Sequence, residues 1–396
     1  MRNKNDTIYV FHTECLFTRG GEKYIFELFR RIAYKHPVVI YFQAISPEWE
    51  EKYKKEGICV RLLWKPRRFY WLLLPLTIFI NTVRLKKTIH KNDTIYSTNF
   101  PFNLIAVYLS NKTICHCSEP LPIFYDPVFI HSLPILSQIA LYIAKLFYSP
   151  FDKIAIKRSS VFTTLNTSVT PYLLRVYKKR PDAYIPNGID TTFFSPSPHK
   201  IMKKNQVVIL GHSTDYTVFK GTKDFLEILY LLKRRYNKFK AIITETLKDE
   251  KIKNQYLTFI RQNALDKHVS FVGNLTEKQL VHFYRSLDVF CFTGSPDCAE
   301  GSTASLSVLE AQSCGVPVIR GIGNKEEIID GVTGYYINPK NHSRVVNVLS
   351  TFISRSQLKR TIMARQARNY IQNNFNWDSS AHVLEYVLRT LRFSTD

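Results

Sequence analysis

Glycine is scarce in this chain, with 14 in 396 residues, about half of the usual frequency of roughly 7%. We therefore expect each glycine to occupy a position where a side chain would not fit. Eleven of the 14 lie between Gly188 and Gly334, where several follow apolar strands or precede helices. Ligands of open α/β sheets bind outside the carboxyl ends of the strands, so these glycines outline a candidate ligand-binding edge.

The sequence lacks the cysteine spacings of a disulfide framework and the residue motifs of a metal site. The seven cysteines are an odd number and form no C-x-x-C pair, which excludes an ordinary disulfide framework and a zinc site of that type. Cys115, His116 and Cys117 are too closely spaced for a normal zinc half-site. The sequence also contains no D-x-D and no H-E-x-x-H. We therefore expect no metal site.

Acidic residues are few and long apolar runs are missing. The chain has 55 Lys and Arg against 32 Asp and Glu, a formal charge of +23, and residues 52–91 hold 11 basic residues against the single Glu56. The apolar run at 69–80 has basic residues on both sides, but its 12 residues are too short to span a bilayer, which takes roughly 20. A second apolar zone, 121–151, is interrupted by four prolines.

The partner of this positive charge is predicted to be a membrane. The first residues carry acid and amide side chains where a signal peptide would be apolar, so we expect a cytoplasmic protein. Its basic first half is expected to lie on an anionic membrane face, where each Lys or Arg contributes about 1 kcal/mol. The alternative is that both apolar stretches are core helices with solvated flanks. No nucleic-acid partner is expected, since the basic residues spread over both halves and no recognised module occurs.

Short β-branched or aromatic runs alternate with segments of helical period throughout the chain. Helices are predicted at 222–235, 277–287 and 376–393 from apolar residues spaced on one face. The alternation predicts an α/β protein with parallel sheets covered by helices, and the length suits two such domains. The predicted strands are residues 7–12, 37–42, 58–63, 93–97, 112–117, 160–166, 206–210, 240–244, 268–273, 288–293 and 316–319.

A proline-rich connection separates the two halves. Residues 180–200 carry four of the 18 prolines in a polar stretch bracketed by basic residues, which is typical of a linker. We therefore predict a first domain at 1–185 and a second at 186–376, with 377–396 as a final helix.

The sequence CAEGSTASLSVLEAQSCGVPVI at 298–319 is the most informative stretch. A helix is predicted to begin at Thr303 or Ala304, with Ser302 or Thr303 as its N-cap. The N-terminus of a helix after small residues presents free N–H groups and suits a phosphate. Further along, the Glu310 carboxylate can accept hydrogen bonds from both hydroxyls of a ribose. Together these features indicate a nucleoside diphosphate site; a capped core helix with a solvated Glu310 is the alternative.

Several motifs occur in one order along nearly the whole chain. They are TRGGEKYIFELFRRI (18–32), HCSEP (116–120), PNGID (186–190), VFKG (218–221), FVGNLTEKQLVHFYRSLDVFCFT (271–293), EGSTASLSVLEAQSCGVPVI (300–319) and IIDGVTGYYI (328–337). In that order the motifs resemble glycosyltransferase family 4, whose members are retaining enzymes. The resemblance implies the GT-B fold, two Rossmann-like domains facing each other across a cleft with a C-terminal helix that crosses back.

The resemblance implies roles for the residues of the second domain. Lys220 would neutralise the diphosphate as the sugar leaves, because negative charge develops there in the transition state. Glu310 would hold the ribose, and Gly273 with Asn274 would lie near the base. The backbone N–H groups facing the diphosphate would come from Ser302, Thr303, Ala304 and Ser305. The nucleotide sugar is the substrate, and neither a cofactor nor a metal is implied.

In the first domain His116 would contact the donor sugar, and Gly20 and Gly21 would let the backbone approach the phosphate or the acceptor. Two features depart from the family pattern. His212 stands where an arginine is usual, and it would replace that arginine only if protonated. Glu300 and Glu310 are ten apart instead of eight, so either Glu300 reaches the sugar through a longer loop or Ser302 takes its place.

The predicted function is transfer of a hexose from a nucleotide-diphosphate sugar to a glycan or a polyprenyl- or lipid-linked acceptor. Two alternatives stay open. A nucleotide-sugar epimerase of the same fold would act on the donor alone, and a degenerate relative would only bind it, as His212 and the glutamate spacing would allow.

Overall fold

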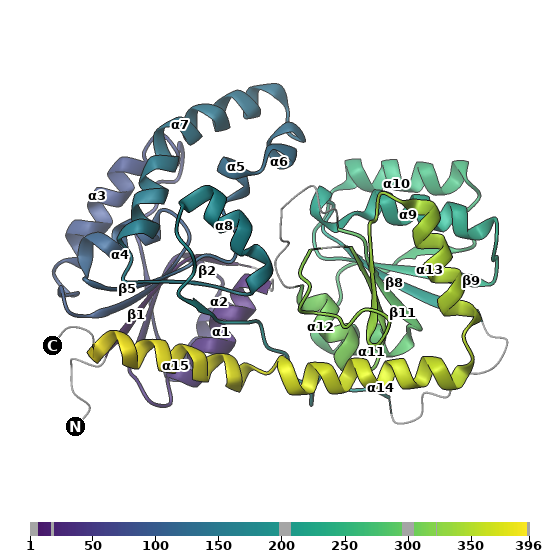
Figure 1. Cartoon of the computed structure of the whole chain (residues 1–396). Helices are drawn as coiled ribbons and strands as arrows, with labels where there is room; N and C mark the ends of the chain where they lie inside the picture. Colours follow the sequence, from purple (N-terminus) through teal and green to yellow (C-terminus); the bar gives the residue numbers. More distant parts are fainter. Residues whose placement is uncertain (1–6, 17–19, 198–206, 295–304, 322, 394–396) are drawn as a thin grey trace. The chain divides into compact units, whose positions relative to one another are not determined.

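The computed structural model describes residues 7–16, 20–197, 207–294, 305–321 and 323–393. The chain forms two compact units, and each has its own sheet and core (Figure 1). Unit 1 comprises residues 1–188 and 377–396, and unit 2 comprises residues 189–376. The last segment of the chain therefore returns to the unit in which the chain begins.

The sheet of unit 1 has the strand order β3-β2-β1-β4-β5-β6-β7, with every paired neighbour parallel. Parallel pairing needs a crossover between consecutive strands, and helices provide it here. Its strands are β1 (Ile8–Cys15), β2 (Val38–Ile45), β3 (Cys59–Leu62), β4 (Thr94–Thr98), β5 (Lys112–His116), β6 (Val161–Thr164) and β7 (Ala183–Tyr184).

Helices cover both faces of this sheet. Figure 1 shows α3, α4 and α7 on one side and α1 with α15 on the other. The helices of unit 1 are α1 (Gly20–Ile32), α2 (Pro47–Lys55), α3 (Leu74–Leu85), α4 (Phe102–Leu109), α5 (Pro122–Tyr125), α6 (Pro127–His131), α7 (Ile135–Arg158), the short 3₁₀ helix η2 (Thr167–Val169), α8 (Thr170–Tyr177) and α15 (Trp377–Phe393).

The sheet of unit 2 is also parallel, with the order β10-β9-β8-β11-β12-β13. Its strands are β8 (Val208–Thr214), β9 (Phe239–Glu245), β10 (Val269–Phe271), β11 (Val289–Phe292), β12 (Val318–Gly321) and β13 (Gly334–Ile337). Its helices are the 3₁₀ helix η3 (Val218–Lys220), α9 (Thr222–Lys233), α10 (Glu250–Gln262), α11 (Glu277–Ser286), α12 (Leu306–Ser313), α13 (His342–Ser354) and α14 (Gln357–Asn374).

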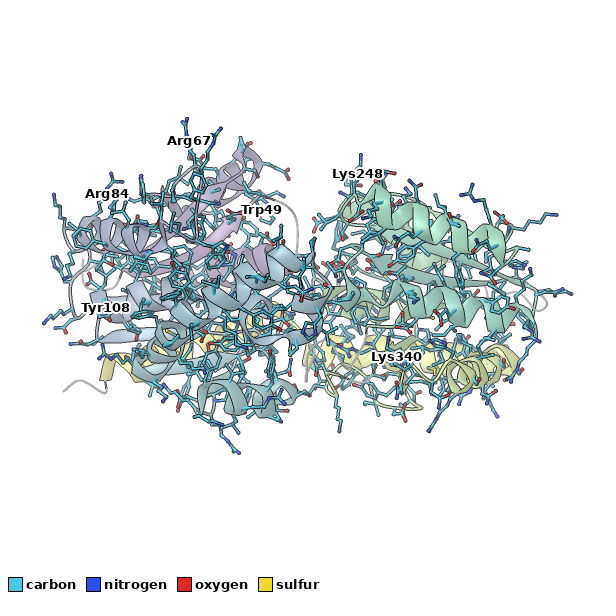
Figure 2. The ribbon with its side chains drawn as sticks, turned by 90° about the horizontal axis from the view of Figure 1, so that it is seen from above. Trp49, Arg67, Arg84, Tyr108, Lys248 and Lys340 are labelled. Atoms are coloured by element: carbon cyan, nitrogen blue, oxygen red, sulfur yellow. The ribbon has the colours of Figure 1, made fainter. Side chains whose placement is uncertain are left out.

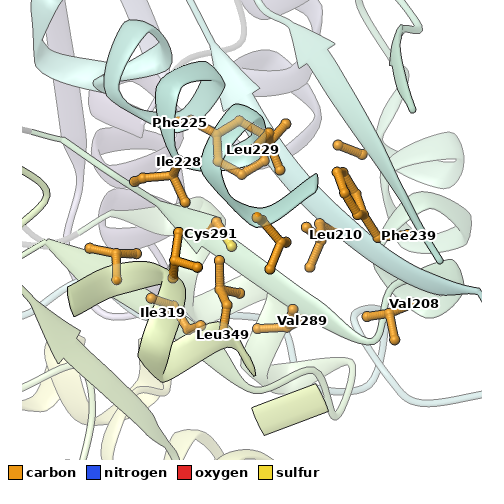
Figure 3. Close-up of a cluster of buried hydrophobic side chains, with 14 of the residues drawn as sticks. Val208, Leu210, Phe225, Ile228, Leu229, Phe239, Val289, Cys291, Ile319 and Leu349 are labelled. Atoms are coloured by element: carbon orange, nitrogen blue, oxygen red, sulfur yellow. The ribbon is translucent and has the colours of Figure 1, made fainter. Parts of the chain in front are cut away.

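The core of unit 2 fills the space between its sheet and α9 with α13. Figure 3 shows Phe225, Ile228 and Leu229 of α9 pointing onto the strands, with Leu349 of α13 in the same cluster. Phe225 and Leu229 belong to the apolar stripe that the sequence predicts, and all three α9 residues are buried. Each such side chain contributes about 1.5–3 kcal/mol by leaving water, so this packing holds the strand ends in place.

The structure confirms the α/β class with parallel sheets, and each of the eleven predicted strands is present. β7 and β13 were missed, because both are short and follow proline- or glycine-rich segments that do not show a strand period. In the described parts of the chain, no helix combines the length and apolar character needed to cross a membrane.

Candidate functional site

Three loops meet at the carboxyl edge of the sheet in unit 2, and glycines allow the contact. Gly221 has a φ of 66°, and a Cβ there would lie 1.8 Å from the carbonyl oxygen of Thr293. A Cβ on Gly321 would lie 2.3 Å from the carbonyl oxygen of Gly294. The loops that follow β8, β11 and β12 therefore pack backbone against backbone. This is the edge at which open α/β sheets bind ligands.

Lys220 lies at this edge, on η3 immediately before Gly221. Its Nζ is 4.0 Å from Oδ2 of Asp215 and 5.6 Å from the centre of the Phe292 ring, and the side chain is 26% exposed. Phe292 ends β11, so the ammonium group is held over the end of a central strand. A partly exposed cation at this place is available to an anionic ligand.

His212, in contrast, is buried inside unit 2 and cannot act as a charged substitute for an arginine. Its Nδ1 lies 2.8 Å from the carbonyl oxygen of Cys291, and its Nε2 lies 3.0 Å from Oγ1 of Thr222. Burial lowers the pKa of the ring to about 4, with the nearby charge of Lys220 acting in the same direction. The neutral ring links β8 to α9, which argues against a protonated His212 at the phosphate; its part in donor binding stays a prediction.

Helix α12 begins at Leu306 with Ser305 in the N-cap position, so the prediction of a start at Thr303 or Ala304 is wrong. The Ser305 side chain makes no capping bond, and Glu327 contacts the free N–H group instead. Glu327 is fully buried and also accepts a hydrogen bond from Nε of Arg320, at the end of β12. Burial raises the pKa of the Glu327 carboxyl, and the Arg320 guanidinium opposes that rise.

The pair of Arg320 and Glu327 was missed by the sequence analysis. It connects β12 to the N-terminal end of α12, and the Arg320 guanidinium lies 5.4 Å from the centre of the Phe292 ring. The ammonium group of Lys220 also lies near this ring, so Phe292 contacts both Lys220 and Arg320. Arg320 in turn pairs with Glu327, which contacts the start of α12. An arginine directly after the apolar strand residues is the only signal in the sequence that could have indicated it.

Glu310 lies in the second turn of α12 and is buried, which excludes the alternative in which it is solvated. The hydroxyl of Tyr284, on α11, donates to its Oε2 at 2.9 Å. Each carboxylate oxygen can accept more than one hydrogen bond, so this contact is compatible with the predicted ribose role. Four other predicted residues, Glu300, Ser302, Thr303 and Ala304, lie outside the described residues.

The loop after β10 carries Gly273 and the exposed Asn274, which were predicted near the base. Glu245, at the end of β9, accepts a hydrogen bond at 3.0 Å from the N–H group of Gly273. Tyr216 and Lys253 donate to the other oxygen of Glu245. Burial raises the pKa of this carboxyl, but these hydrogen bonds outweigh the burial and lower it below its usual range. Glu245 thus acts as the anchor of the predicted base-binding loop.

The predicted residues of unit 1 lie at the carboxyl edge of its own sheet. Gly20 and Gly21 form the exposed first turn of α1, and Tyr24, one turn later, stacks on His116 with 5.0 Å between ring centres. His116 ends β5; its Nδ1 lies 3.1 Å from Oγ1 of Thr163, and its Nε2 lies 3.3 Å from Oγ of Ser118. The glycine turn and His116 are therefore brought together by Tyr24.

A second buried histidine, His12 at β1, was not singled out by the sequence analysis. Its Nδ1 lies 2.7 Å from Oγ1 of Thr98, which pairs with His116 in the sheet register. Burial lowers the pKa of His12 to about 4 and that of His116 to about 3. Both rings are therefore neutral at pH 7, and His116 could act on a ligand as a hydrogen-bonding group without a charge.

We expect unit 1 to lose stability between pH 7 and pH 5 because of these histidines. An unfolded histidine titrates near 6.5, so below that pH the unfolded chain binds a proton that the folded chain does not. The contribution of each neutral histidine to the free energy of unfolding is fully present above pH 6.5 and falls as the pH drops toward the folded pKa. At pH 5 the loss is about 2 kcal/mol per histidine. Urea unfolding of the wild type and of His116→Gln at both pH values measures the difference.

Other groups also titrate in this range; for example, burial raises the pKa of Asp152 to about 6. Because these groups are present in both proteins, the difference between the two proteins isolates His116. His282, exposed on α11, provides the matched control His282→Gln, which should keep the pH dependence of the wild type. An unchanged pH dependence in His116→Gln would contradict the burial of a neutral ring.

Solved structures of glycosyltransferases are similar to this chain in fold. A glycosyltransferase from Rickettsia africae has a TM-score of 0.74 at 16% identity, covering 99% of this chain and 100% of that one. HepE from Anabaena, solved with UDP-glucose, has a TM-score of 0.73 at 14% identity, covering 97% and 99%. At these identities the similarity concerns the fold, and it confirms the predicted GT-B class.

Residues 190–370, which make up most of unit 2, match the family described as "Glycosyl transferases group 1". A GDP-mannose-dependent monoacylated alpha-(1-6)-phosphatidylinositol monomannoside mannosyltransferase from Corynebacterium glutamicum is 19% identical over 257 residues, which are 61% of this chain and 66% of that protein. The matches span between a third and two thirds of the curated relatives. Assignment to family 4 within this group stays a prediction.

Proposed function

We propose that this protein is a retaining glycosyltransferase that moves a hexose from a nucleoside-diphosphate sugar to a glycan or lipid-linked acceptor at a membrane face. The observation that carries the proposal is the carboxyl edge of the sheet in unit 2. There the Lys220 ammonium group and the start of α12 lie on loops that pack together, in a domain of the group 1 family.

The proposed donor site uses complementary groups for each part of a nucleoside diphosphate. The N-terminal end of α12 and Lys220 supply positive potential for the diphosphate. Buried Glu310, oriented by Tyr284, would accept the ribose hydroxyls. The Gly273 loop, held by Glu245, would lie near the base. Glu300 would contact the sugar, and Ser302, Thr303 and Ala304 would supply backbone N–H groups to the diphosphate, since the N–H group of Ser305 is already bonded to Glu327.

The proposed chemistry needs charge stabilisation at the leaving group. When the bond from the sugar to the diphosphate breaks, the bond electrons stay on the phosphate oxygen, and a fixed cation there lowers the barrier. Lys220 supplies that cation. The acceptor hydroxyl then bonds to the same carbon with the stereochemistry retained, and its proton passes to the departing phosphate oxygen. His116 and the Gly20-Gly21 turn would contact the donor sugar and the acceptor from unit 1.

Two relatives support the substrate classes. The Corynebacterium glutamicum protein is named for GDP-mannose and for a phosphatidylinositol-linked acceptor, and HepE was solved with UDP-glucose. Both donors are hexoses on a nucleoside diphosphate. We also propose that catalysis uses no metal. Among the described residues, no group of three or more His, Cys, Asp or Glu side chains could hold a metal ion.

The test is a panel of nucleotide sugars, including UDP-glucose and GDP-mannose, measured by thermal unfolding. A donor at 100 times its Kd that binds only the folded state adds about 2.7 kcal/mol, a rise in Tm of roughly 5–10 °C for a domain of this size. UDP and GDP alone identify the base. Stabilisation by no member of the panel would overturn the proposal. Release of nucleotide only when an acceptor is added would distinguish a transferase from an epimerase.

A further inference from the structure

Helix α7 of unit 1 has its apolar side on the outside. The residues that it buries are Ala144, Ser149, Asp152, Ala155 and Ile156, of which Ile156 is the one large apolar side chain. Its exposed apolar residues repeat every three or four positions, as one face of a helix does. Leu136 is 78% exposed and Leu146 is 74% exposed. The exposed apolar side chains of α7 are Ile135, Leu136, Ile139, Tyr142, Ile143, Leu146, Phe147, Phe151 and Ile154.

Hydrogen bonds inside unit 1 keep α7 in this orientation. Oδ2 of Asp152 accepts from the hydroxyl groups of Tyr125 and Tyr177, each at 3.0 Å. Rotating the helix to bury its apolar side would break both hydrogen bonds. The Asp152 carboxylate or the two tyrosine hydroxyls would then be buried without a partner, which costs free energy. The outward apolar face is therefore built into the fold of unit 1.

Helix α3 repeats the pattern independently. It buries Thr77 and Asn81 together with Leu74 and Leu85. The Asn81 amide pairs with the backbone of Trp64 through two hydrogen bonds of 2.9 Å. Its exposed apolar side chains stand at positions i, i+4, i+7 and i+11, one face of a helix, with the first just before the helix begins. They are Leu72, Leu76, Phe79 and Val83.

The two helices lie on the same side of unit 1. The Tyr148 hydroxyl of α7 donates to the carbonyl oxygen of Trp71 at 2.5 Å, and the two rings are 6.2 Å apart. Both helices contribute to one buried cluster, through Leu74 of α3 and Ala144 and Ala155 of α7. In Figure 1 α3 and α7 flank α4 on the face opposite α1. We call the exposed apolar residues of α3 and α7 the α3–α7 surface.

Basic residues accompany this surface, and acidic ones are missing from the segment that carries α3. From Gly57 to Asn92 the sequence contains no Asp or Glu. The basic residues before and at the end of α3 are exposed, and Figure 2 shows Arg67 and Arg84 projecting away from unit 1. The exposed basic residues of this segment near α3 are Arg67, Arg68, Arg84, Lys86 and Lys87.

We propose that the α3–α7 surface docks on an anionic lipid bilayer, with its apolar side chains in the interface and its basic residues on the headgroups. Soluble proteins rarely expose an apolar patch of this extent without a partner. A second copy of this chain is the poorer partner, because a symmetric contact would bring the basic residues of both copies together. The proposal concerns the location of the enzyme and does not depend on which donor it uses.

Flotation with lipid vesicles tests this surface. The wild-type chain is expected to float with vesicles of phosphatidylcholine mixed with phosphatidylglycerol, and to float poorly with phosphatidylcholine alone. Arg67→Gln with Arg68→Gln should weaken partitioning by roughly fivefold for each charge removed. Leu136→Gln with Leu146→Gln should weaken it by roughly tenfold or more, since two inserted side chains are lost. High salt should reduce binding of the wild type.

Matched controls come from equally exposed apolar residues elsewhere. Tyr386 of α15 is 71% exposed and Leu358 of α14 is 69% exposed, so Tyr386→Gln and Leu358→Gln should float like the wild type. Equal flotation of the α7 variant and these controls would overturn the proposal. So would light scattering that shows a dimer which the α7 variant converts to a monomer, because the surface would then join two copies. Thermal stabilisation by a donor should be unchanged in all variants, which keeps this test separate from the proposed transfer reaction.

Discussion

Replacing Lys220 by alanine is expected to lower kcat/KM by roughly 100- to 1000-fold, the loss seen when one preorganised group at a developing charge is removed. The effect should fall mainly on kcat, because the charge on the diphosphate is larger in the transition state than in the bound donor. The fold should persist, since the Lys220 side chain is partly exposed and its Nζ lies 4.0 Å from Oδ2 of Asp215.

Lys223 provides a matched control for this substitution. It lies three residues further along, on the exposed side of α9, so Lys223→Ala removes the same charge without touching the loop contact at Phe292. Steady-state kinetics of both variants, with donor and acceptor varied in turn, give the comparison. Lys220→Arg should restore part of kcat, because the charge returns in a different shape. Equal activity of Lys220→Ala and Lys223→Ala would contradict the role at the leaving group.

Breaking the buried pair of Arg320 and Glu327 is expected to cause the largest loss of stability. Both side chains are almost fully buried, so Arg320→Met leaves the Glu327 carboxylate with no cation beside it. Removing one partner of a buried pair typically costs about 3–5 kcal/mol. The loss should appear as a lower midpoint in urea unfolding of unit 2. Because Glu327 also contacts the N–H group of Ser305, donor affinity should fall in the same variant.

A double-mutant cycle separates the pair from its surroundings. Arg320→Met with Glu327→Gln removes both charges and should cost less than the two single changes added together, with a coupling of about 1–3 kcal/mol. An exposed ion pair is the control: Lys54 and Glu50 of α2 are 2.9 Å apart, and Lys54→Met should change stability by less than about 0.5 kcal/mol. Additive single effects at Arg320 and Glu327 would show that the two side chains do not stabilise each other.

Much of the fold could be predicted because it depends on periodicity. Strand and helix segments alternate in the sequence, and the stripe of Phe225, Leu226, Leu229 and Leu232 faces the core as predicted. Alternation with crossover helices leads to parallel sheets, whatever the details of packing. The scarcity of glycine was similarly informative, since Gly221 and Gly321 stand where another backbone leaves no room for a Cβ.

Charges and partners inside the site could not be predicted in the same way. Nothing in the sequence around His212 shows whether the ring is exposed and protonated or buried and neutral. The contacts with Cys291 and Thr222 in the folded chain show that it is buried and neutral. The start of α12 was misplaced because several small hydroxyl residues in a row all make good N-caps. In the final helix, which begins at Trp377, Asp378 lies in the first turn and pairs with Arg31, a contact that the sequence does not show.

By itself the sequence determined the class of fold, the two domains with their family resemblance, and the position of the basic apolar segment on which the proposed membrane surface rests. Only the tertiary structure decided which side of α3 and α7 faces water and which carboxylate Arg320 meets. The physical reason is that periodicity is a local property, fixed by residues a few positions apart. Burial and charge pairing depend on side chains such as Asp152 and Tyr177, which are brought together only when the chain folds.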